Sequence, residues 1–397
     1  MRVDLLTREY PPEVYGGAGV HVAELSAVLR RHADVRVRCF GSPRDEDGVT
    51  AYPEPQELSR ANPALRTLGV DLAMAADVGG ADLVHSHTWY ANLAGHVGGL
   101  LHGVPHVLTA HSLEPLRPWK AEQLGGGYAV SSWAEQTAYR GAAGVIAVSA
   151  GMRDDILAAY PDVDPERVRV VHNGIDTSAW TRDEGSEHLE RLGIDPGRRS
   201  VVFVGRITRQ KGLPHLLRAA RDLPPDVQLV LCAGAPDTPE ILAEVSALVR
   251  DLQATRDGVL WIEEMLPREQ LAQVLSAATV FVCPSLYEPL GIVNLEAMAC
   301  GAAVVATATG GIPEVVVPGE TGWLVPIEQV GDGTGTPVDP ARFEADLAAA
   351  LTEAVEDVER ARRYGAAGRR RVETEFSWEQ VGERTLAVYR EVLERSA

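Results

Sequence analysis

The sequence contains few cysteines, and none of them lie in a metal-binding pattern. Four cysteines are scattered along 397 residues, at Cys39, Cys232, Cys283 and Cys300, without any C-x-x-C pair. Disulfide frameworks and cysteine zinc sites bring cysteines together at short, regular spacings. The pattern therefore argues against both kinds of site, and we expect reduced cysteines packed in the core.

Long apolar runs are also missing. No run of 18 apolar residues occurs, and Met1-Arg-Val-Asp leads directly into an expected strand without the apolar core of a signal peptide. We therefore expect no membrane partner and a cytoplasmic location.

Positive charge is scarce. The chain has 37 Lys and Arg against 56 Asp and Glu, which gives a formal net charge of −19. Nucleic-acid binding requires a basic face, so this balance argues against nucleic acid as a partner. Small phosphorylated molecules need only a few local cations. The hydrophobic content of 45% and the charged content of 23% are typical of a soluble globular protein, and the length favours two domains.

Apolar strands alternate with helical patterns in two successive runs. The expected strands of the first run are residues 3–7, 35–40, 81–87, 104–111, 144–149 and 167–171. Those of the second run are 201–204, 227–232, 259–263, 280–283 and 303–307. This alternation predicts an α/β protein with two doubly wound Rossmann-like domains facing across an interdomain cleft. We place the domains at residues 1–172 and 173–376, with a helix at about 377–397 crossing back to the first.

A loop rich in proline and glycine follows the first expected strand. It runs from Arg8 to Gly19 and contains Gly16-Gly17, and a helix is expected from about Val20 to Arg31. A dinucleotide fingerprint is excluded here, because Val22 stands where a third glycine would be needed and the loop is too long. The layout instead favours a phosphate or sugar at the carboxyl edge of a parallel sheet.

Histidines end two of the expected strands. His85 and His87 are two residues apart and so point to the same face of their strand. The local sequence supplies no further metal ligands, so we expect no metal, with His85 packed and His87 lining a cleft. The next strand ends at His111 and leads into a loop, residues 113–128, with Arg117, Lys120 and three glycines. Such a loop is either functional or an ordinary surface loop.

Two glutamates lie eight positions apart after the apolar strand that ends at Cys283. We expect a helix entered through Pro289, with Glu288 just before it and Glu296 two turns inside it. Eight helical residues span ~12 Å, which is on the order of the distance from a sugar to the ribose of its nucleotide. The N–H groups between them suit a diphosphate. The alternative is a pair of solvated surface glutamates.

This E-x7-E motif resembles that of retaining glycosyltransferases with the GT-B fold, in the large family 4 that includes the bacterial glycogen synthases. The resemblance implies that Arg206 and Lys211 bind the donor diphosphate and that Glu288 and His111 hold hydroxyls of the transferred glucose. These four are the candidate catalytic residues, and the resemblance implies no metal and no cofactor. It suggests same-face attack on the sugar, so no nucleophile is assigned. The candidate donor site comprises Gly16, Gly17, Asn173, Arg206, Lys211, Glu288, Leu290, Gly291, Ile292 and Glu296.

The acceptor follows from a narrower resemblance. Residues 6–21 and 111–120 closely resemble those of actinobacterial members of the family known as glycogen synthases. Those enzymes are understood to make α-maltose 1-phosphate from ADP-glucose and glucose 1-phosphate. Starch and bacterial glycogen synthases carry a lysine where this chain has Val14. The candidate acceptor residues are Tyr15, His87, Arg117, Lys120 and Tyr128, with the last three meeting the acceptor phosphate.

Several alternatives stay open at this point. The enzyme would transfer glucose from ADP-glucose either to glucose 1-phosphate or directly to an α-1,4-glucan such as glycogen. Another nucleotide-sugar transferase, a non-catalytic nucleotide-sugar binder and a pyridoxal-dependent phosphorylase are further candidates. No residue that would contact the nucleotide base can be identified from the sequence, so the sequence does not distinguish ADP, GDP and UDP as the carrier of the sugar. A homodimer is a common arrangement for such proteins.

Overall fold

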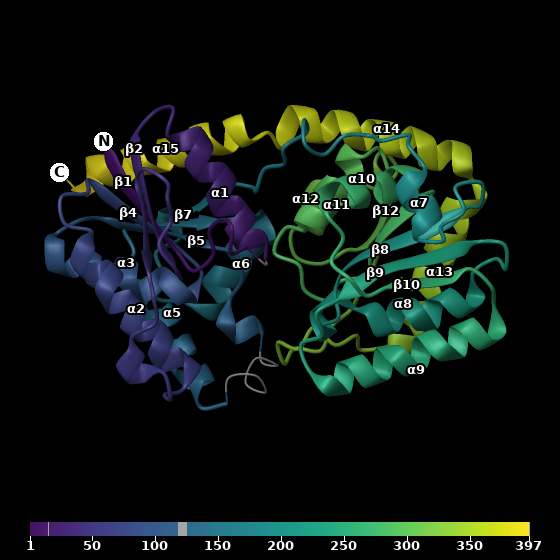
Figure 1. Ribbon diagram of the computed structural model, residues 1–397, viewed down its shortest axis with the longest axis horizontal. Coiled ribbons are helices and arrows are strands. Elements are labelled where there is room, and N and C mark those ends of the chain that lie inside the picture. The colour runs from purple at the N-terminus through teal and green to yellow at the C-terminus, as the bar shows by residue number, and fades with distance from the viewer. Residues whose placement is uncertain (15, 118–124, 397) are drawn as a thin grey trace. The chain divides into compact units, whose positions relative to one another are not determined.

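The computed structural model describes residues 1–14, 16–117 and 125–396. The chain forms two compact units (Figure 1). Residues 1–174 and the C-terminal helix α15 (Trp378–Ser396) form unit 1, and residues 175–377 form unit 2. The boundary placed between residues 172 and 173 lies next to this division, and α15 occupies the segment where a returning helix was expected.

Unit 1 contains one parallel sheet of seven strands in the order β3-β2-β1-β4-β5-β6-β7. The strands are β1 (Arg2–Thr7), β2 (Asp34–Phe40), β3 (Val49–Tyr52), β4 (Leu83–His87), β5 (His106–Ala110), β6 (Gly144–Ala147) and β7 (Val168–Val170). Strand β3 was not predicted, because it has four residues of which only Tyr52 is buried. An edge strand this short carries no readable hydrophobic pattern.

Helices cover both faces of this sheet (Figure 1). The helices of unit 1 besides α15 are α1 (Gly17–Leu29), α2 (Pro63–Asp77), α3 (Trp89–His102), α5 (Gly127–Gly141) and α6 (Ala150–Ala159), with single 3-10 turns η1 (Gln56–Leu58), η2 (Glu114–Leu116) and η3 (Pro165–Arg167). Leu5 of β1 belongs to a cluster with Leu25 of α1 and Tyr389 of α15. Its neighbour Leu6 belongs to another cluster, with Met74 of α2. Successive side chains of β1 therefore pack on opposite faces, as the two-residue period of a strand requires.

Unit 2 repeats this architecture with six parallel strands in the order β10-β9-β8-β11-β12-β13. The strands are β8 (Ser200–Arg206), β9 (Gln228–Gly234), β10 (Val259–Ile262), β11 (Val280–Cys283), β12 (Ala303–Thr307) and β13 (Gly322–Val325). The helices are α7 (Glu187–Arg191), α8 (Leu213–Ala219), α9 (Pro239–Thr255), α10 (Arg268–Ala277), α11 (Ile292–Ala299), α12 (Ile312–Val315), α13 (Pro340–Glu356) and α14 (Val358–Glu375), with η4 (Arg209–Lys211) and η5 (Ala220–Asp222).

An apolar cluster of unit 2 lies on one face of its sheet. Val201 and Phe203 of β8 pack there with Leu217 of α8, Val245 of α9 and Leu351 of α13. Burial of these side chains is the main force that holds the helices onto the sheet.

Both sheets have a point where the strand order reverses. In unit 1 the reversal lies between β1 and β4, and in unit 2 it lies between β8 and β11. In doubly wound folds, the loops that leave such neighbouring strands diverge to opposite faces and open a crevice at the carboxyl edge. The glycine loop after β1 and the histidine at the end of β4 lie at one such point. Arg206, at the end of β8, and the loop after β11 lie at the other.

Two helices begin at positions other than those predicted. Helix α11 starts at Ile292, so the prediction that it is entered through Pro289 was wrong. Gly291 precedes it with a left-handed φ of 92°, and the chain before Gly291 is a loop. Only part of the chain between Glu288 and Glu296 is helical, so the helical estimate of their separation does not hold. Helix α1 starts at Gly17, earlier than Val20, with Gly16 as its N-cap.

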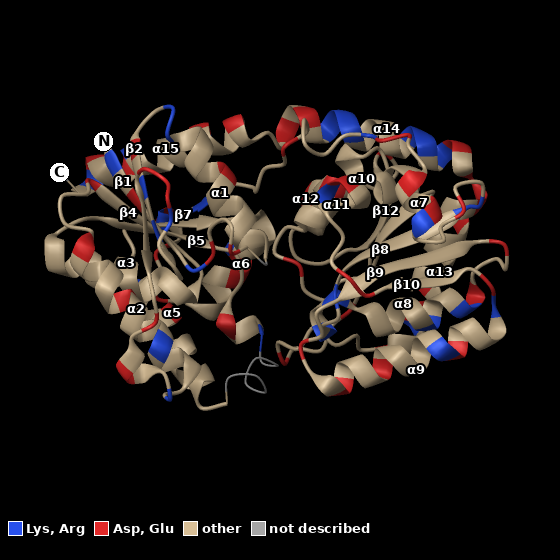
Figure 2. Ribbon diagram, viewed as in Figure 1, with Lys and Arg blue, Asp and Glu red and all other residues tan. Residues whose placement is uncertain are grey.

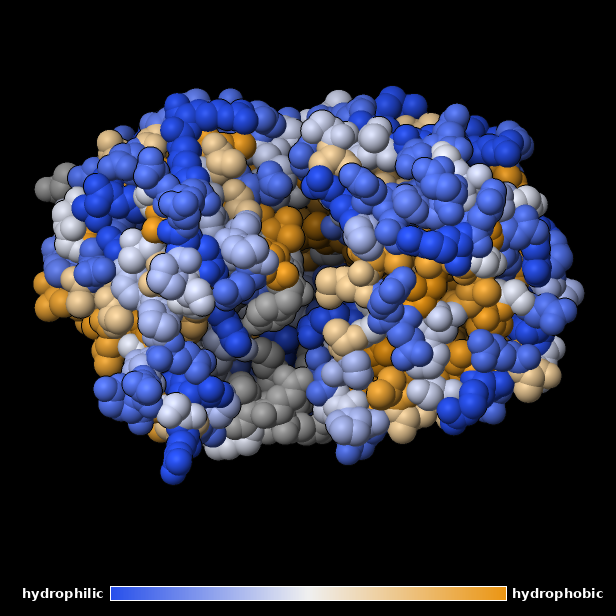
Figure 3. Space-filling model, viewed as in Figure 1, coloured by the Kyte–Doolittle hydropathy of each residue, from blue (hydrophilic) through white to orange (hydrophobic). Residues whose placement is uncertain are grey.

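Helices α9 and α14 carry charges of both signs (Figure 2). Hydrophilic residues cover most of the face shown in Figure 3, with smaller hydrophobic patches between them. Large exposed apolar side chains include Leu100 and Leu101 of α3, which are 75% and 63% exposed. Within the described part of the chain, no helix combines the length and apolar character needed to cross a membrane.

Gly212 allows two loops of unit 2 to touch. Its φ is 65°, and a Cβ on it would lie 1.9 Å from the carbonyl oxygen of Pro284. The residue before it, Lys211, is thereby brought against the segment that follows β11. Gly193 has a similar φ of 73° but nothing within 4 Å of its would-be Cβ.

These two glycines provide a matched test of the loop contact. A Gly193→Ala change should cost only the left-handed backbone strain of about 1–2 kcal/mol. A Gly212→Ala change should lower the free energy of unfolding of unit 2 by about 3 kcal/mol or more, because a backbone clash adds to that strain. Urea unfolding followed by tryptophan fluorescence measures both, and equal losses would show that the loop contact is not needed.

Candidate functional site

An ion pair joins the two loops at the switch point of unit 2. The Nζ of Lys211 lies 2.7 Å from Oε2 of Glu288, and the side chains are only 21% and 9% exposed. Ser285 donates a hydrogen bond from its Oγ to the same carboxylate oxygen at 3.0 Å. The backbone supports this pairing, since Leu286 N–H donates to the Gln210 carbonyl at 2.8 Å. Two segments far apart in the sequence thus present one cation and one carboxylate together.

The pair keeps Lys211 charged. Burial is the largest single cause and lowers the pKa of Lys211, but the charge and hydrogen bond of Glu288 together with Cys283 raise it, and the net shift is upward. A buried ammonium is otherwise costly, so the carboxylate is what allows a full positive charge to persist at this depth.

Arg206 supplies a second cation. Its positive charge reaches Lys211, whose pKa it lowers. The guanidinium is 43% exposed and lies 3.0 Å from Oδ1 of Asp237, a partner that sequence reasoning missed. Because Asp237 follows a different strand, β9, only the parallel arrangement of β8 and β9 places it beside Arg206. The structure therefore brings Arg206, Lys211 and Glu288 to one edge of the sheet.

The backbone of Glu288 is held by a second glycine contact. Gly311 N–H donates to the Glu288 carbonyl at 3.0 Å. Gly310 has a φ of 53°, and a Cβ there would lie 2.0 Å from the same carbonyl oxygen. Both glycines therefore make close contact with the backbone of Glu288. The loop after β12 thus fixes the position of the carboxylate.

Helix α11 begins directly beside this carboxylate. Leu290 is buried, Gly291 is the N-cap and Ile292 is the first helical residue, and the first turn contains no acidic side chain. Its free N–H groups and positive dipole end are suited to an anion. Asn294 is fully buried, and neither its Oδ1 nor its Nδ2 has a partner within the described chain. A Cβ on Gly291 would lie 2.5 Å from the Asn294 Nδ2 and 3.2 Å from the Glu288 Cγ, so the amide is a further site candidate that spacing alone did not reveal.

Glu296 lies on the second turn of α11. Burial raises its pKa to about 7, although Lys211 acts in the opposite direction. The carboxyl group is therefore partly protonated near neutral pH and can either donate or accept a hydrogen bond.

In unit 1, the candidate glycines stand at the start of α1. Gly16 N–H donates to Oε2 of Glu9 at 2.8 Å, and Gly17 is exposed. The amide that was expected to approach a phosphate is thus bonded to a carboxylate of the same loop. Tyr15, an acceptor candidate, lies outside the described residues.

Histidines from three elements meet at the carboxyl edge of unit 1. His21 of α1, His87 of β4 and His111 after β5 each offer a ring nitrogen, and these atoms lie within 4.8 Å of one another. His87 Nδ1 is 3.1 Å from His111 Nε2. His87 is fully buried, although it was expected to line a cleft. The local sequence lacked further ligands for a metal at His87, whereas the fold brings two more histidines to it.

Asn173 belongs to this group. It lies in unit 1, although it was placed at the start of the second domain and in the donor site. It is only 5% exposed, and its side chain acts on His21 by raising a pKa that burial lowers to about 4. Trp378 of α15 also packs edge-on against the His21 ring at 5.4 Å.

Two of the three acceptor-phosphate candidates, Arg117 and Tyr128, each bond to the segment that follows β5. Nη1 of Arg117 donates to Ser112 Oγ at 3.1 Å, and its Nε is buried without a partner in the described chain. Tyr128 donates its hydroxyl to the Glu114 carbonyl at 2.7 Å. In this structure the hydroxyl of Tyr128 is thus directed at a backbone carbonyl of unit 1, and its contact with an acceptor phosphate stays a prediction. Lys120 lies outside the described residues.

Beneath this loop lies a buried carboxyl group. Glu135 of α5 accepts from the Glu114 N–H at 2.8 Å and from the Tyr160 hydroxyl. Burial, followed by the negative charge of Glu114, raises the pKa of Glu135 to about 8. Glu135 thus anchors the loop that carries Arg117.

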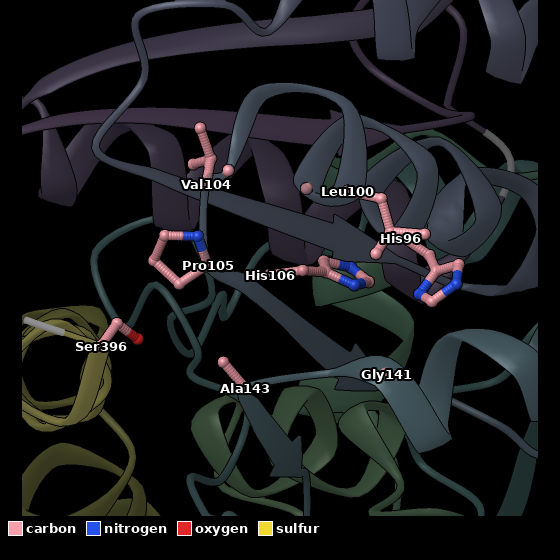
Figure 4. A pocket seen from close by; sticks show the side chains of 10 residues that line it. His96, Leu100, Val104, Pro105, His106, Gly141, Ala143 and Ser396 are labelled. Atoms are coloured by element: carbon pink, nitrogen blue, oxygen red, sulfur yellow. The ribbon is translucent and has the colours of Figure 1, made fainter.

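Unit 1 also has a cavity at the opposite edge of its sheet (Figure 4). It measures about 290 Å³ and is lined by residues that include His96, Pro105, His106 and Ser396. His106 is the first residue of β5, whereas His111 follows its last residue. Since ligands of doubly wound folds bind beyond the carboxyl ends of the strands, this cavity does not belong to the candidate site.

Comparison with known proteins assigns the class. Residues 186–371 match the family described as "Glycosyl transferases group 1", and residues 15–179 match "Glycosyltransferase Family 4". The fold is that of sucrose-phosphate synthase from Thermosynechococcus elongatus, with a TM-score of 0.76 and 25% identity over 99% of both chains. HepE from Anabaena in complex with UDP-glucose has a TM-score of 0.78 and 20% identity over 98% of this chain and 100% of that one. The protein is thus a glycosyltransferase with the two Rossmann-like domains of the GT-B fold.

Similarity to individual proteins narrows the family. The chain is 60% identical to the α-maltose-1-phosphate synthase of Mycolicibacterium smegmatis, over 99% of this chain and 100% of that protein. It is 58% identical, over the same shares, to the enzyme of that name from Mycobacterium tuberculosis. It is 37% identical to a D-inositol 3-phosphate glycosyltransferase of Mycobacterium sp., over 73% of this chain and 65% of that one. The chain belongs to the glycosyltransferase family that includes these α-maltose-1-phosphate synthases.

The Glu135 anchor makes a prediction about pH. Because its pKa of about 8 exceeds the ordinary value of 4.5, the folded state binds the proton more tightly than the unfolded state. The corresponding stability is fully present below pH 4.5 and is lost as the pH rises through about 8. The Glu135→Gln variant should therefore show a shallower decline of the urea midpoint across this range than the original chain. Parallel profiles would contradict the assignment.

Proposed function

We propose that this enzyme is a retaining glucosyltransferase that transfers glucose from ADP-glucose to α-glucose 1-phosphate and forms α-maltose 1-phosphate for α-glucan synthesis. The observation that carries the proposal is the 60% identity to an α-maltose-1-phosphate synthase over the full length of both chains. The name of the inositol-phosphate relative also indicates a phosphorylated acceptor. Direct elongation of glycogen from ADP-glucose is the alternative that the experiment below separates.

The charges of unit 2 support a role in releasing a nucleoside diphosphate. A leaving diphosphate gains negative charge as the glycosidic bond breaks, and fixed cations lower the barrier to that step. Arg206 and Lys211 are two such cations, and the start of α11 adds oriented N–H groups. In this mechanism they stabilise the leaving group without a metal or another cofactor.

The Glu288 carboxylate has two roles in the proposed mechanism. It forms the ion pair that holds Lys211 in place and keeps it charged. The same carboxylate accepts a hydrogen bond from a hydroxyl of the transferred glucose. Glu296, farther along α11, meets the ribose. Its pKa of about 7 means that it accepts hydrogen bonds more readily as the pH rises above neutrality.

The acceptor is proposed to bind unit 1. Neutral imidazoles such as those of the buried His87 and the partly buried His111 exchange hydrogen bonds with sugar hydroxyls without adding charge. The acceptor phosphate is assigned to Arg117, whose Nε lacks a partner in the described chain, together with Lys120. The acceptor hydroxyl attacks from the face that the diphosphate leaves, and a phosphate oxygen of the donor takes its proton.

Mass spectrometry of the products tests the proposal. ADP-glucose with glucose 1-phosphate should yield a phosphorylated disaccharide, and UDP-glucose and GDP-glucose serve as donor controls. Proton NMR of the new linkage should show the α configuration. A longer glucan from glycogen, with no phosphorylated disaccharide, would overturn the assignment of the acceptor.

Lys211 and Arg209 form a matched pair for testing the donor site. Both belong to η4, but Arg209 is exposed and does not pair with Glu288. The Lys211→Ala variant should lose about 10²–10³-fold in kcat, because it lacks the charge that stabilises the leaving diphosphate. The Arg209→Ala variant should stay within about threefold of the original rate. Similar losses in both variants would contradict the proposed role.

A further inference from the structure

The three histidines of unit 1 have the arrangement of a metal site. They come from three different elements: α1, the end of β4 and the residue after β5. One nitrogen from each of His21, His87 and His111 lies within 4.8 Å of the other two, and the shortest measured separation is 3.1 Å, between His87 and His111. Ligands at about 2.0–2.1 Å from a tetrahedral zinc ion lie roughly 3.4 Å apart. Side-chain movements of on the order of 1 Å would therefore complete the set.

The buried ring of His21 lacks a well-formed hydrogen bond. It is only 2% exposed, and neither of its ring nitrogens has a hydrogen-bond partner of good geometry within the described chain, although the side chain of Asn173 lies close enough to interact with it. Buried polar atoms without partners are uncommon, because each loses its bond to water and gains nothing in return. Coordination of an ion would satisfy such nitrogens.

His85 packs against the ring of His87, with ring centroids 4.3 Å apart and an interplanar angle of 39°. The nitrogens of His85 are held by the Tyr389 hydroxyl at 2.6 Å and by Thr109 Oγ1 at 2.7 Å. The ring that packs beside His87 is therefore itself held in place.

We propose that His21, His87 and His111 bind one divalent ion of the zinc class, with water in the fourth position. Three histidines and an open position form a donor set that zinc accepts. His87 and His111 are also the side chains proposed to meet the sugars. Bound zinc would hence compete with substrate and inhibit glucosyl transfer, and this consequence rests on the function proposed above.

Binding is tested with the full chain after removal of metals with a chelator. Zinc sulfate should bind with one tight site per chain in competition with a chromophoric chelator. The His21→Ala and His87→Ala variants should weaken this site by at least about 100-fold, more than the loss of an outer partner usually causes. The His96→Ala variant is the matched control, since His96 lies in unit 1 at the cavity of Figure 4 and outside the cluster.

Two further measurements make the result decisive. Cobalt in place of zinc should give the strong visible absorption of a tetrahedral site in the original chain and in His96→Ala, but not in His21→Ala. Thermal unfolding without metal checks that each variant folds, and His21→Asn replaces His21→Ala if the latter does not. An equal affinity of His21→Ala and His96→Ala for zinc, or no tight site in the original chain, would overturn the proposal.

The inhibitory consequence has its own readout. For each variant, the rate of glucosyl transfer with zinc is divided by the rate of the same variant without zinc. A change in basal activity therefore does not affect the comparison. Zinc should slow the original chain and His96→Ala, while His21→Ala resists it. Tight binding without any inhibition would overturn the placement of the ion beside the substrate. If no variant transfers glucose at all, the proposed function fails, and the binding and cobalt measurements still decide the metal site.

Discussion

The arrangement of unit 2 depends on the buried contact between the Lys211 ammonium and the Glu288 carboxylate. Removal of two charges from water costs several kcal/mol per ion, and only close, well-oriented pairing offsets that cost. The required closeness comes from backbone contacts that side chains would block, at Gly212 against Pro284 and at Gly310 against Glu288. Because Gly212 and Gly310 have no side chains, the loops can approach closely enough to hold the charged Lys211 at the switch point of the sheet.

The two units place different chemistry at equivalent edges of equivalent sheets. At the carboxyl edge of unit 2 the polar groups are charged, and Arg206 and Lys211 lie beside the start of α11. At the carboxyl edge of unit 1 they are imidazoles that burial keeps neutral. Charged groups suit a diphosphate, and neutral donors and acceptors suit sugar hydroxyls. The proposed assignment of donor and acceptor follows this difference.

Much of the fold could be predicted from the sequence, because buried parallel strands are continuous apolar runs and helices carry a 3.6-residue period. Strand β3 and the start of α11 lack those signals. Strand β3 buries one side chain, and α11 begins at Ile292 because Gly291 takes a left-handed conformation that composition alone does not locate. In the site, Arg206, Lys211 and Glu288 could be named from their motifs. Asp237, Asn294 and His21 could not, since no spacing links them to the residues they accompany.

The sequence by itself determined the two runs of strand and helix, the pair of cations Arg206 and Lys211 around the end of β8, and the E-x7-E spacing, because each is expressed over a few neighbouring residues. Only the tertiary structure decided that Lys211 pairs with Glu288, 77 residues later in the chain, and that the Tyr128 hydroxyl donates to the Glu114 carbonyl. It also decided that His21, His87 and His111 lie close together. The physical reason is that parallel strands bring residues together through long crossovers. Such contacts depend on strand order and register, which no local pattern encodes.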